Sequence, residues 1–181
     1  MTTTPPPLTG AGTAAVTAAA AALAAQQERV AALLARAARH SQPLSPEARR
    51  RLVRLGHFPA YGAELDWTPH EVAGHLRDSA RVFTDRIRRI GEEDRPALPD
   101  FVPDDPARVA GYRAVPPAVL LAELAAAQAE LLAAVRAVDV GRLGAVGVHE
   151  ADGPVTLAGL LAFLPGHQRD HAEQLAALVD G

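Results

Sequence analysis

The chain has 181 residues, of which 4% are aromatic and 22% are charged, and its formal net charge is −3 with its seven histidines neutral. It contains no cysteine, which excludes disulfides, thiolate metal ligands and a thiol nucleophile carried by the protein itself. The acidic balance argues against nucleic acid as a partner, because nucleic-acid binders usually present a basic face. All eighteen basic residues are arginine and alanine is abundant, a composition typical of GC-rich, actinobacterial genomes.

The N-terminal segment is expected to be a tail. Residues 1–11 are rich in threonine, proline and glycine, so we predict disorder there and a single domain over residues 12–181. The segment lacks a basic region, and the alanine-rich run that follows is interrupted by polar residues between Gln26 and Arg29. This pattern is neither a secretory signal nor a membrane span, so we predict a cytoplasmic protein with no membrane partner.

Apolar residues that recur at spacings of three and four predict four long amphipathic helices and one short accessory helix. The clearest start is a capping box, in which Thr68 and Glu71 enclose a first-turn proline. Ser45 and Thr156 are expected to cap two further helices. No strand with an alternating pattern is evident, so the predicted fold class is all-α, a four-helix bundle. The predicted helices cover residues 12–40, 45–55, 68–90, 116–138 and 156–179.

Two connections between these helices are long. Residues 91–115 are acidic and proline-rich, and a structureless segment of this length is typical of a lid, a crossover or a binding loop. Residues 139–155 are rich in turn-forming residues and lead into the last helix.

Three histidines lie on the predicted inner faces of two long helices. His167 and His171 are four residues apart, so their imidazoles share one face of the last helix. His75 is the only histidine on the inner face of another long helix. Three neutral imidazoles would suit Zn²⁺, Ni²⁺, Co²⁺ or Fe²⁺ and would leave positions open for water or substrate, as in catalytic sites. Packing is the alternative interpretation, in which these are hydrogen-bonded histidines of the core.

Two aspartates lie close to these histidines in the sequence. Asp78 follows His75 by one turn and is a candidate catalytic acid or base. Asp170 precedes His171 directly, and either aspartate could hold the second ring nitrogen of a ligand histidine. Exposure to solvent is the competing interpretation for both.

Further polar residues are candidates for substrate binding. Ser79 and Arg86 continue the stripe of His75 along the helix, although Arg86 could equally form an ion pair at the end of the bundle. Gln128 is the one polar residue in the apolar stripe of the third long helix. His40, His57 and His70 occupy predicted surface or cap positions, and we assign them no role.

Three segments of the chain resemble the DinB/YfiT-like superfamily, over about residues 66–178. They are DWTPHEVAGHLRDSARVFTDRIRRI, EEDRPALPDF and HEADGPVTLAGLLAFLPGHQRDHAEQL. The resemblance implies a four-helix bundle that holds a divalent metal through His75, His167 and His171. His149 resembles a histidine that family members carry just before the last helix, and it is a candidate catalytic residue at the pocket mouth.

The resemblance also implies a reaction class. Members with assigned activity include a maleylpyruvate isomerase that uses mycothiol, and S-transferases that use mycothiol or bacillithiol. The implied role of the metal is to bind and ionise the thiol, which then attacks an electrophilic carbon. Other members are proposed to be metal-dependent hydrolases or tailoring enzymes.

The chain departs from the family pattern at two positions. Ala80 stands where a glutamate is expected after HLRDS, so any role of that acid is absent. Pro165 lies just before His167, where it removes a backbone hydrogen bond and is expected to kink the last helix or divide it in two. A kink that tilted His167 away would disrupt the metal site.

Our leading hypothesis is a metal-dependent S-transferase or isomerase that uses a low-molecular-weight thiol, mycothiol above all. A metal-dependent hydrolase, lyase or cyclase acting on a small molecule or secondary metabolite is the second. A non-catalytic bundle of the same fold is the third. A homodimer is compatible with the resemblance, but no residue pattern identifies an interface.

Overall fold

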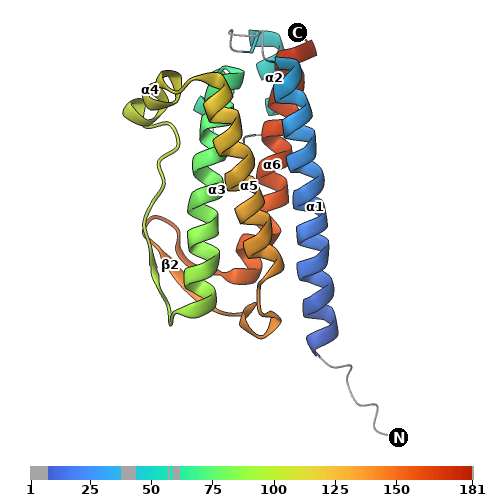
Figure 1. The fold of residues 1–181 in the computed structure, drawn as a ribbon, viewed down its shortest axis with the longest axis vertical. Coiled ribbons are helices and arrows are strands. Elements are labelled where there is room, and N and C mark those ends of the chain that lie inside the picture. The colour runs from blue at the N-terminus through green and yellow to red at the C-terminus, as the bar shows by residue number, and fades with distance from the viewer. Residues whose placement is uncertain (1–7, 38–43, 57, 59–61, 181) are drawn as a thin grey trace, which may run out of the picture.

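The computed structural model describes residues 8–37, 44–56, 58 and 62–180. Four long helices form a bundle in which α3 packs against α5 and α6, while α1 packs against α6 and α5 (Figure 1). This arrangement confirms the predicted all-α four-helix bundle. The four helices are α1 (Leu8–Ala37), α3 (Pro69–Glu92), α5 (Pro117–Arg136) and α6 (Leu157–Asp180).

Three predicted helix starts are confirmed by their side-chain caps. Ser45 accepts a hydrogen bond from the backbone N–H of Ala48 and opens the short helix α2 (Pro46–Arg54). Thr68 and Glu71 form both halves of the capping box at the start of α3. Thr156 accepts from the backbone N–H of Gly159 at 3.0 Å, which caps α6. Each cap satisfies a backbone donor that has no partner within the helix.

The first helix begins earlier than predicted. Helix α1 starts at Leu8, so residues 8–11 are helical and the expected disordered tail is wrong for them. Residues 1–7, and the predicted end of this helix at His40, lie outside the described residues. The other three long helices agree with their predicted boundaries to within two residues.

The two long connections contain regular structure that the sequence did not predict. The first carries strand β1 (Ala97–Leu98) and helix α4 (Pro106–Ala114), and its chain runs back along the outside of α3 (Figure 1). The second carries the 3-10 helix η2 (Val140–Arg142) and the hairpin of β2 (Val146–His149) and β3 (Gly153–Thr156). Strand β2 pairs in parallel with β1 and antiparallel with β3. The strands are two to four residues long, too short to show an alternating pattern.

The bundle interior has two apolar clusters with polar residues between them. One cluster is built on Leu23, Ile87, Leu131 and Leu161, and the other on Val30, Leu76, Leu124 and Leu175. Along α3 and α6, the histidines and Ser79 fall where one cluster gives way to the other. Three buried glutamines continue this polar layer across α1, α5 and α6, with hydrogen bonds from Gln27 to the Gln128 carbonyl (3.1 Å) and from Gln128 to Gln168 (3.3 Å).

Helix α5 is the one described helix that is long and apolar enough to cross a membrane, judged by length and composition alone. Its leucines at positions 120, 124 and 131 are buried, and the helix packs against α3 and α1. Core helices of bundle proteins meet the same criterion, and 39% of the apolar window of α5 is buried.

Candidate metal centre

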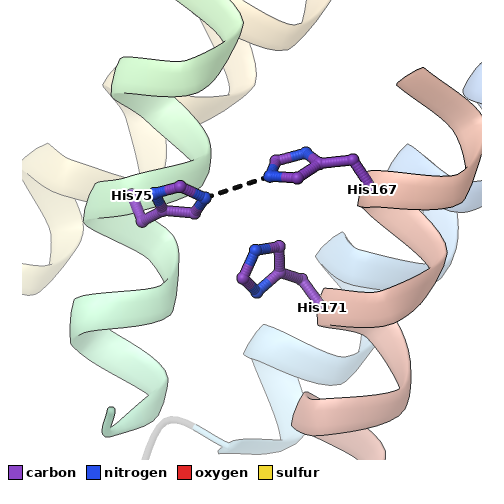
Figure 2. A group of neighbouring side chains, drawn as sticks. All are labelled: His75, His167 and His171. Carbon is purple, nitrogen blue, oxygen red and sulfur yellow. Dashed lines mark hydrogen bonds between the residues drawn. The ribbon is translucent and has the colours of Figure 1, made fainter. Parts of the chain in front are cut away.

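The fold brings the three predicted ligands together. His75 extends from α3, and His167 and His171 extend from α6, into one space between the two helices (Figure 2). The Nε2 atoms of His75 and His167 are 3.1 Å apart, and one ring nitrogen from each histidine lies within 4.8 Å of the others. We refer to His75, His167 and His171 as the histidine triad.

The triad has the geometry and the free nitrogens that a metal ion needs. Two imidazole nitrogens bound at about 2.0–2.1 Å to one ion lie about 2.9–3.4 Å apart, for angles between right and tetrahedral. The observed 3.1 Å between His75 and His167 falls in this range. Nδ1 of His167 and Nε2 of His171 are buried without a hydrogen-bond partner in the described part of the chain. Unpartnered buried nitrogens are costly, and a cation in the triad would supply the missing partner for Nε2 of His171. It would bind His167 through Nε2, the nitrogen that faces His75, and not through Nδ1.

Pro165 does not divide the last helix. Helix α6 runs without a break from Leu157 to Asp180 with Pro165 inside it. Both histidines therefore stay on one helical face, four residues apart, and both face His75. Of the two outcomes that the sequence left open, the continuous helix is the one observed.

Burial keeps the rings of His75 and His167 uncharged near neutral pH. Burial is the main cause that lowers the pKa of His75 well below its ordinary 6.5, and charge on His171 or His167 would lower it further. Burial also lowers the pKa of His167 well below 6.5, although this ring keeps partial exposure in the adjoining cavity. Metal ligation requires the unprotonated imidazole, so these shifts favour it.

A glutamine fixes the orientation of His171. The Gln174 amide nitrogen donates to the backbone carbonyl of Glu64, so its oxygen faces Nδ1 of His171, at 3.0 Å. Nδ1 must then carry the ring proton, which leaves the Nε2 lone pair for the triad. Gln174 thus makes a contact of the kind that the sequence offered to Asp170, and Asp170 forms an ion pair with Arg169 at 3.0 Å.

Glu64 is a buried carboxylate that the sequence did not signal. It lies on the 3-10 helix η1 (Gly62–Asp66), which precedes α3, and it is only 3% exposed. Its Oε2 is 3.3 Å from Nε2 of His171, although the two atoms are not aligned as a hydrogen bond. Glu64 and the triad therefore place one acid beside three imidazoles.

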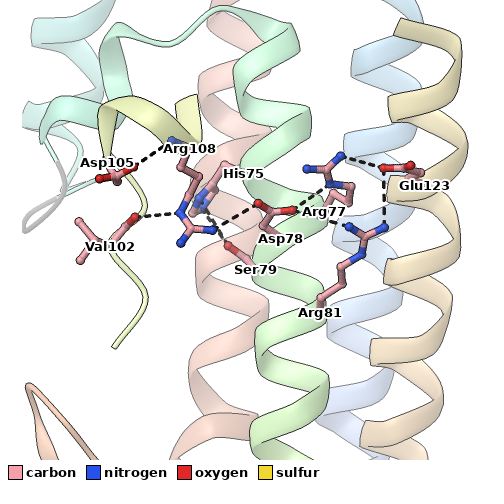
Figure 3. A network of polar contacts seen from close by, with 9 residues as sticks. All are labelled: His75, Arg77, Asp78, Ser79, Arg81, Val102, Asp105, Arg108 and Glu123. Atoms are coloured by element: carbon pink, nitrogen blue, oxygen red, sulfur yellow. Dashed lines mark hydrogen bonds and ion pairs between the residues drawn. The ribbon is translucent and has the colours of Figure 1, made fainter. Parts of the chain in front are cut away.

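Asp78, whose catalytic role stays a prediction, lies among arginines in the structure. Its carboxylate accepts a hydrogen bond from Arg77 at 2.9 Å. It also forms ion pairs with Arg81 (3.9 Å) and Arg108 (3.5 Å), as Figure 3 shows. Asp78 does not line the cavity beside the triad. Its partners are arginines of α3 and α4, so it ties these two helices together.

Arg108 holds the covering segment over the triad. Its Nε donates to the Val102 carbonyl at 3.1 Å, and its guanidinium lies 4.4 Å from the centre of the Phe101 ring. That ring is in turn 6.0 Å from the ring of His75. The ion pair of Arg108 with Asp78 thus anchors an aromatic cover to α3.

Aromatic rings enclose the triad. All four phenylalanines and the only tryptophan of the chain have a ring centre within 6.1 Å of a triad histidine. In a protein with so few aromatics, this concentration indicates a pocket that excludes water and presents apolar walls. The pairs are Phe58–His171 (5.1 Å), Trp67–His75 (5.0 Å), Phe101–His75 (6.0 Å), Phe83–His167 (6.1 Å) and Phe163–His167 (5.6 Å).

A cavity of about 380 Å³ opens beside the triad, and we call it the site cavity. His75 and His167 form one part of its wall, and the predicted substrate residue Ser79 lies next to them with Oγ 3.2 Å from Nε2 of His75. Gln128 does not line it. Its side chain donates a hydrogen bond to Gln168 in the polar layer, and its substrate role stays a prediction.

Arg86, farther along α3, and His149, at the end of β2, also line the site cavity. Both are buried, and Nη2 of Arg86 lies 2.8 Å from Nε2 of His149. The same Nη2 donates to the Pro99 carbonyl at 2.8 Å. The sequence placed both residues at the site, but their contact joins α3 to the end of β2 and could not be read from either segment alone.

Ala80, the position that departs from the family pattern, is fully buried in an apolar cluster. Its methyl group packs against apolar side chains at the position where the family pattern has a glutamate.

Comparisons with known proteins agree with this description. The solved structure of YfiT from Bacillus subtilis, described as "a probable metal-dependent hydrolase with an unusual four-helix bundle topology", has a similar fold, with a TM-score of 0.59 at 17% identity. The match covers 86% of this chain and 85% of that one. Comparison with curated proteins gives no significant match. A sequence model described as "DinB superfamily" matches residues 58–175. The chain belongs to the DinB superfamily.

Proposed function

We propose that the protein is a metal-dependent enzyme that acts on a small organic molecule. The observation that carries this proposal is the convergence of three histidines, with unpartnered buried nitrogens, beside a cavity of about 380 Å³. Structural zinc sites are usually closed by four protein ligands, whereas three histidines leave coordination positions open. Because His75 and His167 line the site cavity, those positions would face the space where a substrate can enter.

A divalent ion in the triad would act as a Lewis acid that lowers the pKa of a bound thiol or water toward neutral. Neutral imidazoles favour zinc or nickel, with iron and cobalt as further candidates. The protein's own contribution is orientation and exclusion of water. Gln174 fixes the tautomer of His171, and the surrounding aromatic rings keep the site dry.

Within this class, our leading proposal is S-transfer or isomerisation with a low-molecular-weight thiol, mycothiol first. The family resemblance supports it, and so does the absence of cysteine, since the thiol must then arrive with a co-substrate. A cavity of this volume is at the small end for ligand sites, so only the reacting ends of two substrates would share it. The thiolate would attack an electrophilic carbon held against the walls formed by Phe83 and Phe101.

Hydrolysis is the second candidate, with lyase or cyclase chemistry as variants of it. Glu64 favours it, because a buried carboxylate 3.3 Å from Nε2 of His171 is placed to accept a proton from a water molecule at the triad. The description of YfiT as a probable hydrolase points the same way. A non-catalytic bundle is the third candidate, and it would be favoured by a triad that takes up no metal.

The proposal includes a cytoplasmic location, small-molecule partners, and neither nucleic acid nor membrane as a partner. A homodimer is compatible with it. Size-exclusion chromatography with light scattering would give the oligomeric state.

The test begins with protein reconstituted with each candidate metal. We expect mycothiol to bind the metal-loaded protein in calorimetry and to be conjugated to members of an electrophile panel. Replacing His75 with glutamine should abolish both, whereas the matched change His70→Gln on the same helix, outside the site cavity, should not. Metal-loaded protein without thiol binding or conjugation would overturn the thiol proposal. Turnover of an ester and amide panel would then establish the hydrolase.

A further inference from the structure

We propose that Arg86 and His149 form an anion-binding subsite that holds a carboxylate group of the substrate. This inference rests on the proposed function, because the reacting end of the same molecule would lie at the histidine triad. It adds the chemical class of the substrate, which neither the fold nor the triad specifies.

Arg86 carries a buried positive charge, and none of the ion pairs between described residues includes it. It is 8% exposed and lines the site cavity. Its two hydrogen-bond contacts both use Nη2 and both reach neutral groups, the Pro99 carbonyl and the His149 ring, each at 2.8 Å. Its Nε is buried with no partner among the described residues, and no described carboxylate forms an ion pair with it. Burying a guanidinium costs free energy unless an anion pairs with its charge and accepts its remaining N–H groups.

The ring of His149 faces N–H donors at both of its nitrogens, and two carboxylates lie near it, with Asp152 Oδ2 3.3 Å from Nδ1 and Asp100 Oδ1 3.8 Å from Nε2. Nη2 of Arg86 faces Nε2 of His149, and the backbone N–H of Asp152 faces Nδ1 at 3.1 Å. A neutral imidazole accepts at only one of its two nitrogens, so one of these donors is left without an acceptor. Nε of Arg86 is buried and finds no acceptor among the described residues, even though Asp100 and Asp152 lie near His149. A substrate carboxylate would supply that acceptor.

The carboxylates near Arg86 favour a substrate group with one negative charge over a group with two. Asp100 and Asp152 line the same cavity, but their side chains are 40% and 77% exposed and therefore largely solvated. Burial lowers the pKa of Arg86, and the charges of Asp100, Asp152 and Asp85 oppose that shift from a distance. These carboxylates would repel a phosphate dianion more strongly than a monoanionic carboxylate. The subsite thus fits a carboxylic acid better than a phosphate ester.

The distance to the triad limits the size of the substrate. The guanidinium carbon of Arg86 is 5.5 Å from the centre of the Phe83 ring, which is 6.1 Å from that of His167, so the two ends are at most about 12 Å apart. Phe83 and Phe101 line the space between them. The substrate is therefore a small carboxylic acid with an apolar or aromatic body, whose reacting group lies within this distance of the carboxylate.

The test compares 3-phenylpropionate with its uncharged alcohol, 3-phenylpropanol, as probes for metal-loaded and metal-free protein. We expect the acid to bind the wild-type protein about tenfold more tightly than the alcohol, or better, as for charge-assisted hydrogen bonds. Arg86→Gln should remove this preference. Arg88→Gln, an exposed arginine on the same helix, should retain it. Isothermal titration calorimetry gives the affinities.

Equal affinity of the wild-type protein for the acid and the alcohol would contradict the subsite. A preference for the acid that survives in Arg86→Gln would also contradict it, because the carboxylate would then be bound by another group, such as the metal. The wild-type comparison decides the question even if Arg86→Gln does not fold. Metal uptake is followed separately through the fluorescence of Trp67, whose ring is 5.0 Å from that of His75. If the protein takes up metal but does not prefer the acid, only the subsite is contradicted. If it prefers the acid but takes up no metal, the subsite is supported and the proposed function is contradicted.

Discussion

The metal-free protein should lose stability as the pH falls through the range in which free histidine titrates. His75 and His167 have pKa values well below 6.5 in the folded state because they are buried. Above about pH 6.5 both states hold these rings neutral, so they add no pH dependence. Below it the unfolded chain binds protons that the folded chain does not, and stability falls with pH.

The size of this effect follows from the number of buried rings. Each histidine that stays neutral in the folded state lowers the free energy of unfolding by up to about 1.4 kcal/mol per pH unit, so the two together give up to about 2.7 kcal/mol per unit. From about pH 6.5 to about pH 5 the loss reaches roughly 3 kcal/mol, because the unfolded rings are only half protonated at pH 6.5, and this is a large part of the stability of a typical domain. Below the folded-state pKa values the loss would level off.

Urea denaturation in the presence of a chelator, at a series of pH values, measures this slope. His75→Gln and His167→Gln should each remove about half of it, and the double variant should remove nearly all of it, because glutamine does not titrate. A double variant that keeps the wild-type slope would refute the reasoning. A wild-type slope near zero would do so as well.

Two further predictions concern packing and ligand orientation. Gly74→Ala should destabilise the protein by about 1–3 kcal/mol in urea denaturation, because a Cβ at this position would overlap the ring of Tyr112. Gln174→Leu should weaken metal binding about 10–100-fold, since it frees Nδ1 of His171, whereas Asp170→Asn should leave the affinity unchanged. Quenching of the single tryptophan by Ni²⁺ or Co²⁺ reports these affinities.

Each of these has a clear contrary result. An alanine at position 74 that leaves the urea midpoint in place would mean that the tyrosine ring can shift without cost. Equal metal affinities for the variants at positions 174 and 170 would mean that the Gln174 contact does not orient His171.

Helical periodicity explains what could be predicted from the sequence. A spacing of four places His167 and His171 on one face, and the stripe of apolar residues through His75 identifies the inner face of α3. The same logic could have found Gln174, which lies three residues after His171 on the same face. Caps such as Thr68 are equally local, which is why their predictions were correct.

The features of the site that could not be predicted from the sequence depend on contacts between segments far apart in the chain. Glu64 reaches His171 from an element more than one hundred residues away, and no local pattern signals it. Asp78 is close to His75 in sequence, yet its orientation is decided by Arg108 on a helix that the sequence did not predict. The strands were missed because two to four residues show no periodicity.

The central claim is tested most directly by the metal content of protein purified without a histidine tag, measured by plasma mass spectrometry. We expect close to one divalent ion per chain in the wild-type protein and none in the His167→Ala, His171→Ala double variant, with helicity by circular dichroism retained in both. A wild-type protein that holds no zinc, nickel, cobalt or iron after reconstitution would contradict the claim, and the triad would then be a feature of core packing.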